Sequence, residues 1–167
     1  GIVFLGGAPN LENSIIMNNS GNGLWTYSNS DGDKTRPYVQ NVLIANNSAR
    51  GVELNNADPF FSAVTIVNNG SDGIFCYNNS DPTAINSIIW GNSINISDTY
   101  SSANITYSNI QGGYSGTGNI ETEPMFVKVI TTGDEESDYH LQDSSPAIGT
   151  GTATGAPTTD IEGNPRP

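Results

Sequence analysis

The sequence predicts an all-β solenoid in which the chain winds through about four to five stacked coils. The first observation is a repeated segment made of an apolar run, an asparagine pair, a glycine and a second apolar run. The second is its period, because the later asparagine recurs at intervals of 28, 22 and 23 residues, at Asn19, Asn47, Asn69 and Asn92. The third is a matching glycine row, at Gly23, Gly51 and Gly73. A period of about 20–30 residues with strand-like runs is typical of solenoids.

Each repeat contains two strand-like runs, one before the asparagine pair and one after the glycine. Side chains alternate between the two faces of a strand, so residues of one parity should point into the solenoid. In the first run the inward positions are Ile16, Ile44, Ile66 and Ile89. In the second run they are Leu24, Val52 and Ile74, followed by Thr26, Leu54 and Cys76. The positions that should point outward are Trp25, Glu53 and Phe75.

The asparagine and glycine rows have a structural interpretation. An asparagine at a buried bend can donate its amide to the side-chain carbonyl of the asparagine on the next coil. We therefore expect Asn19, Asn47, Asn69 and Asn92 to form a ladder. The glycines that follow are expected to adopt positive φ where the chain turns into the next strand.

The chain is expected to form one domain with two parts. Residues 1–112 carry the repeats and should form the parallel coils. Residues 113–167 lack the repeat, and a glycine-rich loop leads into acidic and proline-containing stretches. A solenoid would otherwise end in an open strand edge. We therefore expect residues 113–167 to be an irregular segment that caps the last coil.

The composition limits the partners of the chain. It has 167 residues, with 5 Lys and Arg against 17 Asp and Glu, and a formal net charge of −12. Nucleic acids and anionic membranes would be repelled by such a surface. No apolar run approaches the length that spans a bilayer, so no membrane insertion is expected. Cys76 is the only cysteine, which excludes a disulfide within the chain.

Four segments of the second half resemble one family. They are NSIIWGN at residues 86–92, ITYSNIQGGYSGTGNIETEPMFV at 105–127, DYHLQDSSPAIGTG at 138–151 and TDIEGNPRP at 159–167. In this order they resemble the C-terminal part of the secreted choice-of-anchor Q type of right-handed parallel β-helix protein. The resemblance implies a right-handed coil, bacterial or archaeal export to the cell surface or medium, and frequent contact with polysaccharides.

Both ends of the sequence suggest that it is part of a longer polypeptide. The chain opens on the apolar run GIVFL without an initiator methionine. It stops at Pro167, where the resembled family continues into a further strand. The expected partners are therefore the rest of that polypeptide and a polysaccharide or cell-surface glycan.

Two catalytic interpretations follow from the fold relatives that the resemblance implies, which include polysaccharide lyases and hydrolases. A lyase needs a base and a cation to neutralise a uronate carboxylate, and the candidates are Lys34, Arg36 and Arg50. A hydrolase needs paired carboxylates. Glu53 is an outward strand residue without an aligned acidic partner on a strand. For each set, an exposed structural role is the stronger interpretation.

Two acidic segments raise the question of a calcium site. Asn29, Asp31 and Asp33 alternate in a glycine-containing loop, as the oxygen ligands of calcium loops do. The bidentate glutamate that completes an EF-hand loop does not follow them. A second acidic cluster contains Asp134, Glu135, Glu136 and Asp138. Calcium is thus a candidate structural cofactor, for which the sequence shows part of a binding loop.

Outward aromatic residues favour carbohydrate contact over catalysis. Sugars stack their apolar faces on aromatic rings, while nearby carboxylates and amides bind the hydroxyl groups. The candidate sugar-binding residues are Trp25, Tyr27, Glu53, Phe75 and Tyr77. The sequence therefore favours a non-catalytic extracellular module, associated with carbohydrate or purely structural. The alternative is the C-terminal part of a β-helical polysaccharide lyase or glycoside hydrolase.

Overall fold

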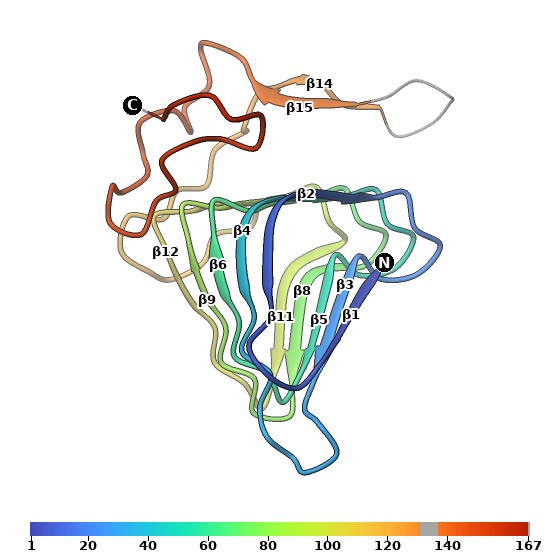
Figure 1. Ribbon diagram of the computed structural model, residues 1–167. Helices are drawn as coiled ribbons and strands as arrows, with labels where there is room; N and C mark the ends of the chain where they lie inside the picture. The colour runs from blue at the N-terminus through green and yellow to red at the C-terminus, as the bar shows by residue number, and fades with distance from the viewer. Residues whose placement is uncertain (131–136, 167) are drawn as a thin grey trace.

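The computed structural model describes residues 1–130 and 137–166 of the chain. The chain winds through about five turns whose strands stack in parallel register, and every regular element of the described residues is a strand. Figure 1 shows the coils stacked one behind another, with the C-terminal segment above them. The predicted all-β solenoid is confirmed.

Three walls of parallel strands surround the core. Wall 1 consists of β1 (Ile2–Leu5), β3 (Leu24–Tyr27), β5 (Val52–Asn55), β8 (Asp72–Tyr77) and β11 (Ile94–Thr99). Wall 2 consists of β6 (Phe60–Ser62), β9 (Thr83–Ile85), β12 (Asn104–Thr106) and the first halves of β2 (Asn10–Met17) and β4 (Tyr38–Ala45). Wall 3 consists of β7 (Thr65–Val67), β10 (Ile88–Trp90), β13 (Asn109–Ile110) and the second halves of β2 and β4.

The inward columns predicted from the sequence form the core. Ile44 pairs with Ile16 and Ile66, and Ile66 with Ile89. All four are buried, as are Leu24, Val52 and Ile74 on wall 1. Similar residues on successive coils stack into columns of side chains that fill the interior. These columns contain most of the buried apolar residues.

Wall 2 corrects the expectation of two strands per repeat, because each complete coil has three. Its strands are short, and their inward column is Leu11, Val39, Phe61, Ala84 and Ile105. A row of prolines precedes them, at Pro9, Pro37, Pro59 and Pro82, with the same intervals as the asparagines. Each proline carbonyl of this row accepts a backbone hydrogen bond from the next coil. Proline is compatible with the start of a strand, because no ladder donor is needed there.

The asparagine ladder is confirmed at the corner between walls 3 and 1. Asn47 donates through Nδ2 to Oδ1 of Asn69 at 2.9 Å, and Asn69 donates to Asn92 at 3.0 Å.

The positive φ predicted for the glycine row is wrong. The left-handed residues of this corner are Asn18, Asn46, Asn68 and Gly91. Gly51 is required for space, because a Cβ there would lie 2.7 Å from Ile66 and 2.8 Å from the Gly73 carbonyl.

The C-terminal segment covers two surfaces. Its first part closes the last coil, where Ile120 pairs with Asn109 and the Asn119 side chain donates to the Ile105 carbonyl. Beyond it, β14 (Phe126–Lys128) and β15 (Asp138–Leu141) form an antiparallel pair above wall 3 (Figure 1). Phe126 and Tyr139 pack there with Ala45 and Val67. The segment therefore shields one side of the solenoid as well as its end.

Candidate functional site

The outer face of wall 1 brings the predicted aromatic residues together. Trp25 pairs in register with Glu53, and Glu53 pairs with Phe75, so all three point outward from neighbouring coils. Trp25 and Tyr27 form a ring pair with centroids 5.1 Å apart, and Phe75 and Tyr77 form another at 5.2 Å. One strand, β5, separates the two pairs. The result is two aromatic pairs on either side of a polar strand.

Glu53 holds this face together rather than projecting from it. It is 8% exposed. Its Oε2 accepts from Asn22 at 2.8 Å and from Arg50 at 2.9 Å, and its Oε1 accepts from the Tyr77 hydroxyl at 3.3 Å. Burial and then the charge of Glu53 raise the pKa of Tyr77. The carboxylate therefore fixes the residues around it.

Arg50 lies at the corner that precedes β5. Its Nε donates to Asp72 at 3.0 Å, its Nη1 donates to Glu53, and its guanidinium lies 4.1 Å from the centroid of the Phe75 ring. A planar guanidinium that donates hydrogen bonds from its edge and stacks its face on an aromatic ring is held in one orientation. Arg50 therefore positions Phe75 on the outer face of wall 1.

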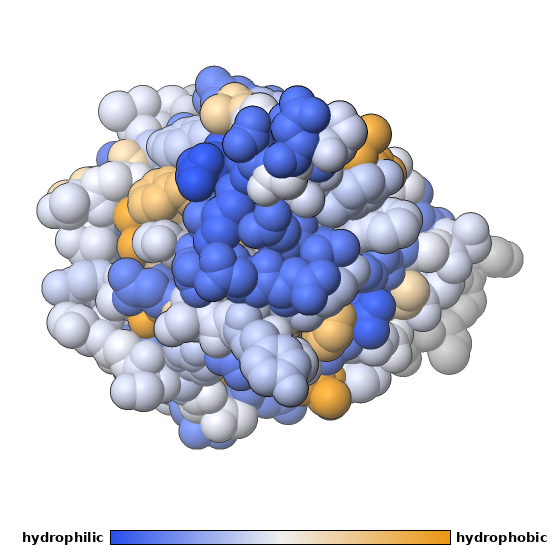
Figure 2. All heavy atoms as spheres, turned by 90° about the horizontal axis from the view of Figure 1, so that it is seen from below, coloured by the Kyte–Doolittle hydropathy of each residue, from blue (hydrophilic) through white to orange (hydrophobic). Residues whose placement is uncertain are grey.

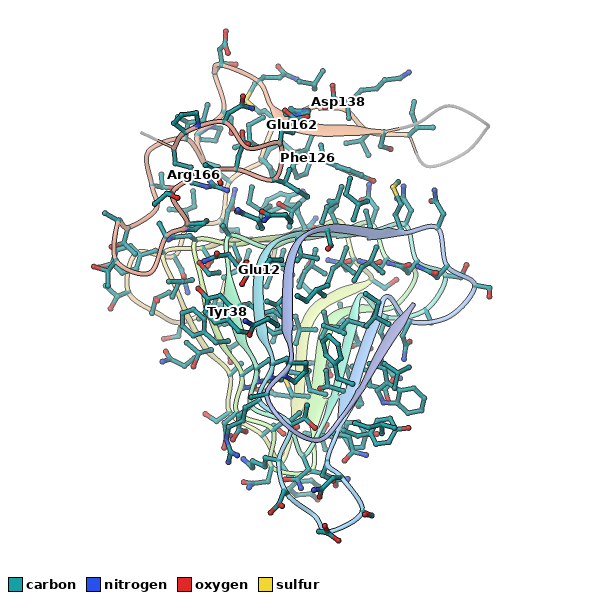
Figure 3. The ribbon with its side chains drawn as sticks, viewed as in Figure 1. Glu12, Tyr38, Phe126, Asp138, Glu162 and Arg166 are labelled. Carbon is teal, nitrogen blue, oxygen red and sulfur yellow. The ribbon has the colours of Figure 1, made fainter. Side chains whose placement is uncertain are left out.

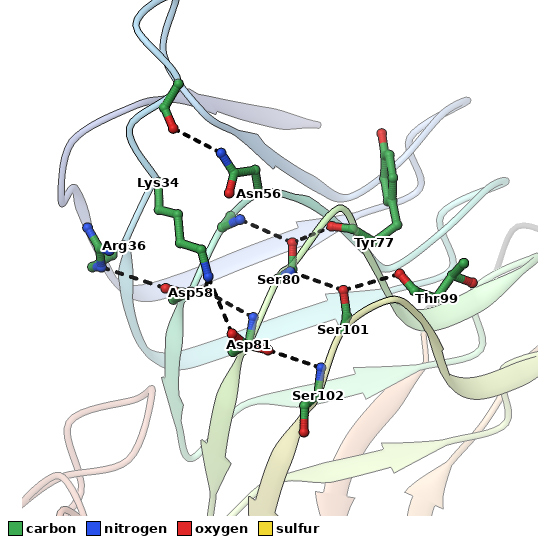
Figure 4. Close-up of polar contacts among 12 residues, drawn as sticks. Lys34, Arg36, Asn56, Asp58, Tyr77, Ser80, Asp81, Thr99, Ser101 and Ser102 are labelled. Atoms are coloured by element: carbon green, nitrogen blue, oxygen red, sulfur yellow. Dashed lines mark hydrogen bonds and ion pairs between the residues drawn. The ribbon is translucent and has the colours of Figure 1, made fainter.

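Lys34 and Arg36 are separate from Arg50, because they follow β3 whereas Arg50 precedes β5, at the opposite end of the wall 1 strands. Figure 4 shows Lys34 and Arg36 beside Asp58 and Asp81. The Lys34 ammonium lies 2.7 Å from Asp58 and 3.3 Å from Asp81, and Arg36 lies 3.7 Å from Asp58. Burial alone would lower the pKa of Lys34, but the hydrogen bonds and charges of Asp58 and Asp81 raise it above its ordinary value. The structure does not bring the three lyase candidates into one site.

Asn29, Asp31 and Asp33 lie on the exposed loop between β3 and β4. The Asn29 side-chain oxygen accepts from the backbone of Asp31 and of Asp33, so the loop itself uses this oxygen. Hydrophilic side chains fill the centre of this end of the molecule, as Figure 2 shows. Among residues 1–130 and 137–166, no three His, Cys, Asp or Glu side chains form a group that could hold a metal ion.

The second acidic cluster lies partly outside the described residues, since Asp134, Glu135 and Glu136 are not described. Its remaining member, Asp138, is on β15 and contacts His140, whose other ring nitrogen lies 3.2 Å from Glu162. Figure 3 shows Asp138 and Glu162 in the segment above wall 3. A cavity of about 450 Å³ lies beneath them. It is lined by apolar residues of wall 3, including Ile15, Met17 and Leu43.

Cys76 is a core residue, as predicted. It is fully buried, and burial, followed by the charges of nearby aspartates, raises its pKa to about 12. The thiolate is the reactive form of cysteine. Cys76 therefore remains a protonated thiol that packs in the core.

Sequence reasoning missed two residues of the wall 1 face, Asn22 and Asp72. Both contact the Arg50–Glu53 pair, Asn22 through Glu53 and Asp72 through Arg50. A signal was available, because Asn22, Arg50 and Asp72 follow one another at the intervals of the asparagine ladder. Positions that recur with the period lie side by side on successive coils.

Comparison with known families agrees with this geometry. The family described as right handed beta helix region matches residues 1–121. The chain belongs to this family. The match covers all five turns of the β-helix and ends where the chain leaves the last coil. No curated protein and no solved structure matched the chain. In the described part of this β-helix, no helix is long and apolar enough to cross a membrane.

Proposed function

We propose that the chain is a non-catalytic, extracellular carbohydrate-binding module, and that it binds polysaccharide on the outer face of wall 1. The observation that carries the proposal is the pair of aromatic clusters fixed in register on alternate coils. Membership of the β-helix family is consistent with a carbohydrate-related or structural role. The partner is a polysaccharide or cell-surface glycan.

The contacts around the aromatic residues support binding by a preformed surface. Trp25 is 38% exposed although it is a large aromatic residue. Tyr77 and Phe75 are held by Glu53 and Arg50. Rings that are fixed before the ligand arrives lose little conformational entropy on binding. Hydroxyl, amide and guanidinium groups beside the rings can bond to sugar hydroxyls.

A catalytic role for the described residues has less support. Proton abstraction needs a base that can accept a proton. Lys34 has a raised pKa and is paired with two aspartates, so it is protonated at neutral pH. Arg50 is paired with Glu53 and Asp72, and the carboxylate of Glu53 is occupied by three donors. These groups stabilise the fold without leaving a free base.

Replacing Trp25 with alanine tests the proposal. We expect Trp25→Ala to weaken binding about tenfold, equivalent to about 1.4 kcal/mol, because one stacking surface is lost. The measurement is affinity electrophoresis through gels that contain neutral or acidic polysaccharides, with and without Ca²⁺.

The matched control is Tyr38→Ala. Tyr38 lies on wall 2, where it stacks on Phe60 with centroids 5.5 Å apart (Figure 3). This variant should bind as the parent protein does, and both variants should retain the β-rich circular dichroism spectrum. Equal retardation of parent and Trp25→Ala would refute the proposed site.

A further inference from the structure

We propose that the wall 1 face selects a neutral, extended polysaccharide that runs along the solenoid axis, across successive coils. This inference rests on the proposed function, since it specifies the ligand of the same face. Two independent observations carry it. One is the balance of charges around Arg50, and the other is the spacing of the aromatic pairs.

The charge balance disfavours an acidic sugar. Arg50 is the cation that borders the face, and it already contacts two carboxylates, Glu53 at 2.9 Å and Asp72 at 3.0 Å. The group of three has a formal charge of −1 when all are ionised. A uronate carboxylate placed there would face net negative charge, within a chain whose formal charge is −12.

The cations at the far end of the wall 1 strands do not change this balance. Lys34 contacts Asp58 and Asp81, and Arg36 contacts Asp58 as well. Two cations thus share two carboxylates, which leaves no excess positive charge for an acidic chain. A ligand without charge avoids the cost of burying an unpaired carboxylate.

The spacing of the aromatic pairs gives the direction. Trp25 on β3 and Phe75 on β8 both align with Glu53 on β5, so a line between them crosses the strands along the solenoid axis. Neighbouring strands lie about 4.8 Å apart, which separates the two rings by roughly 10 Å. In an extended chain of linked sugars, alternate units present the same face at a spacing of this order. One unit can then stack on each pair while the unit between them meets β5.

The charge argument is tested by titration calorimetry with oligosaccharides of equal length. The probes are cellohexaose, mannohexaose and xylohexaose, compared with hexagalacturonate. We expect at least one neutral hexasaccharide to bind about tenfold or more tightly than hexagalacturonate. Tighter binding of hexagalacturonate would overturn the inference while the proposed carbohydrate function stands. If no neutral or acidic glycan binds, the proposed function fails, and this inference fails with it.

A variant tests the cause of the selectivity. In Asp72→Asn, Arg50 loses one of its two carboxylates, so we expect the affinity for hexagalacturonate, relative to that for the neutral ligand, to rise severalfold. The spectrum of the variant is checked first for native fold, and Glu53→Gln provides a second variant if Asp72→Asn does not fold. If a folded variant still binds hexagalacturonate as weakly as the parent does, the pairing of Arg50 with two carboxylates is not the cause of the selectivity.

The direction is tested with ligand length. Affinity should rise about tenfold from the disaccharide to the hexasaccharide of the bound series, because only the longer chain reaches both aromatic pairs. Phe75→Ala should remove most of that gain, whereas Tyr38→Ala should preserve it. An equal gain in Phe75→Ala and the parent would exclude a chain that spans both pairs along the axis.

Discussion

The side chain of Asn47 forms hydrogen bonds with residues of both neighbouring coils. Its Nδ2 donates to Asn69 at 2.9 Å and to the Ile16 carbonyl at 3.2 Å. Its Oδ1 accepts from the side chain of Asn19 at 2.7 Å and from the backbone of Asn19 at 3.1 Å. Asn47 is 1% exposed, so no solvent can replace these partners.

We expect Asn47→Ala to destabilise the protein by about 1–3 kcal/mol, because the substitution leaves buried donors and acceptors without partners. Urea unfolding followed by circular dichroism measures the change. Asn104→Ala is the control, since Asn104 is exposed on β12, and it should change stability by less than about 0.5 kcal/mol. Similar unfolding midpoints for the two variants would contradict a structural ladder.

Thr26 presents the opposite case. It is fully buried on wall 1, and its hydroxyl has no hydrogen-bond partner among the described residues. Thr26→Val keeps the shape and removes the unpaired hydroxyl, so we expect stability to rise by about 1 kcal/mol. Thermal unfolding measures the gain, with Thr26→Ala as the control that removes the methyl as well and should destabilise. A loss of stability in Thr26→Val would show that the hydroxyl is satisfied.

For single residues, the sequence predicts hydrogen-bond partners better than it predicts backbone dihedral angles. Asn47 and Asn69 could be paired in advance because their residue type recurs with the period. The role of Gly51 could not, because its constraint comes from Ile66, Asn69 and Gly73 of the neighbouring coil. The left-handed conformation falls instead on the preceding asparagines, whose short polar side chains tolerate it.

The corner asparagines also bind one element to another. Asn86 donates to the Thr152 carbonyl at 2.9 Å and accepts from the Thr152 amide at 2.8 Å. Its side-chain amide thus pairs with the Thr152 backbone as one residue of a strand pairs with a neighbouring strand. Asn46 accepts from the Tyr139 hydroxyl at 2.9 Å. The left-handed turn directs these side chains away from the core, where the C-terminal segment can reach them. Residues that shape the coil therefore also hold its cover.

His140 should show a raised pKa in a nuclear magnetic resonance titration. Its hydrogen bond with Asp138 and then that with Glu162 raise its pKa above the ordinary value of about 6.5. The stabilising effect is fully present below about pH 6.5 and is lost as pH rises through the raised folded pKa. It should be small, since the His140 side chain is 61% exposed.

The matched variants for this titration are Asp138→Asn and Glu162→Gln. Each should lower the pKa of His140, and Asp138→Asn should lower it more because Asp138 has the larger effect. A pKa at or below about 6.5 in the parent protein would contradict the arrangement of β15 beside residues 160–162.

The third strand of each coil shows why some elements escape a search for periodic apolar runs. β6 and β9 have three residues each, so only one apolar side chain in each strand, Phe61 or Ala84, packs in the core. Phe61 and Ala84 occupy equivalent positions yet differ greatly in size. The proline row was the better signal, because Pro37, Pro59 and Pro82 keep the period where the apolar residues vary.

Over the whole molecule, acidic charge is the main electrostatic feature. The formal net charge is −12, and Lys34, Arg36 and Arg50 are each paired with a carboxylate. Like charges on a compact body repel one another and oppose folding. Salt screens this repulsion over about 8 Å at physiological ionic strength.

We therefore expect the melting temperature to rise as sodium chloride increases from low concentration to about 0.15 M. Differential scanning calorimetry measures the rise. The double variant Asp31→Asn, Asp33→Asn removes two exposed charges from the loop between β3 and β4, so its melting temperature should respond less to salt. A melting temperature that falls with salt would mean that ion pairs, rather than net repulsion, dominate.

The wall 1 face could be predicted in composition but not in its internal organisation. Alternation along the strands placed Trp25, Glu53 and Phe75 outward. It could not show that Arg50 would stack on Phe75, because Arg50 lies in a corner where strand alternation does not apply. The orientation of a side chain at a corner depends on its contacts with the neighbouring coil. Strand alternation in the sequence does not predict these contacts.

The loop between β3 and β4 has a consequence for how such a chain can change. Trp25 and Glu53 remain in register although 28 residues separate them, whereas 22 separate Glu53 from Phe75. The extra residues leave the stack at a corner, and the strands on both sides of it stay aligned. Insertions and deletions at this corner are therefore nearly independent of the rest of the molecule. Evolution, or a protein engineer, can graft new peptides there without disturbing the scaffold.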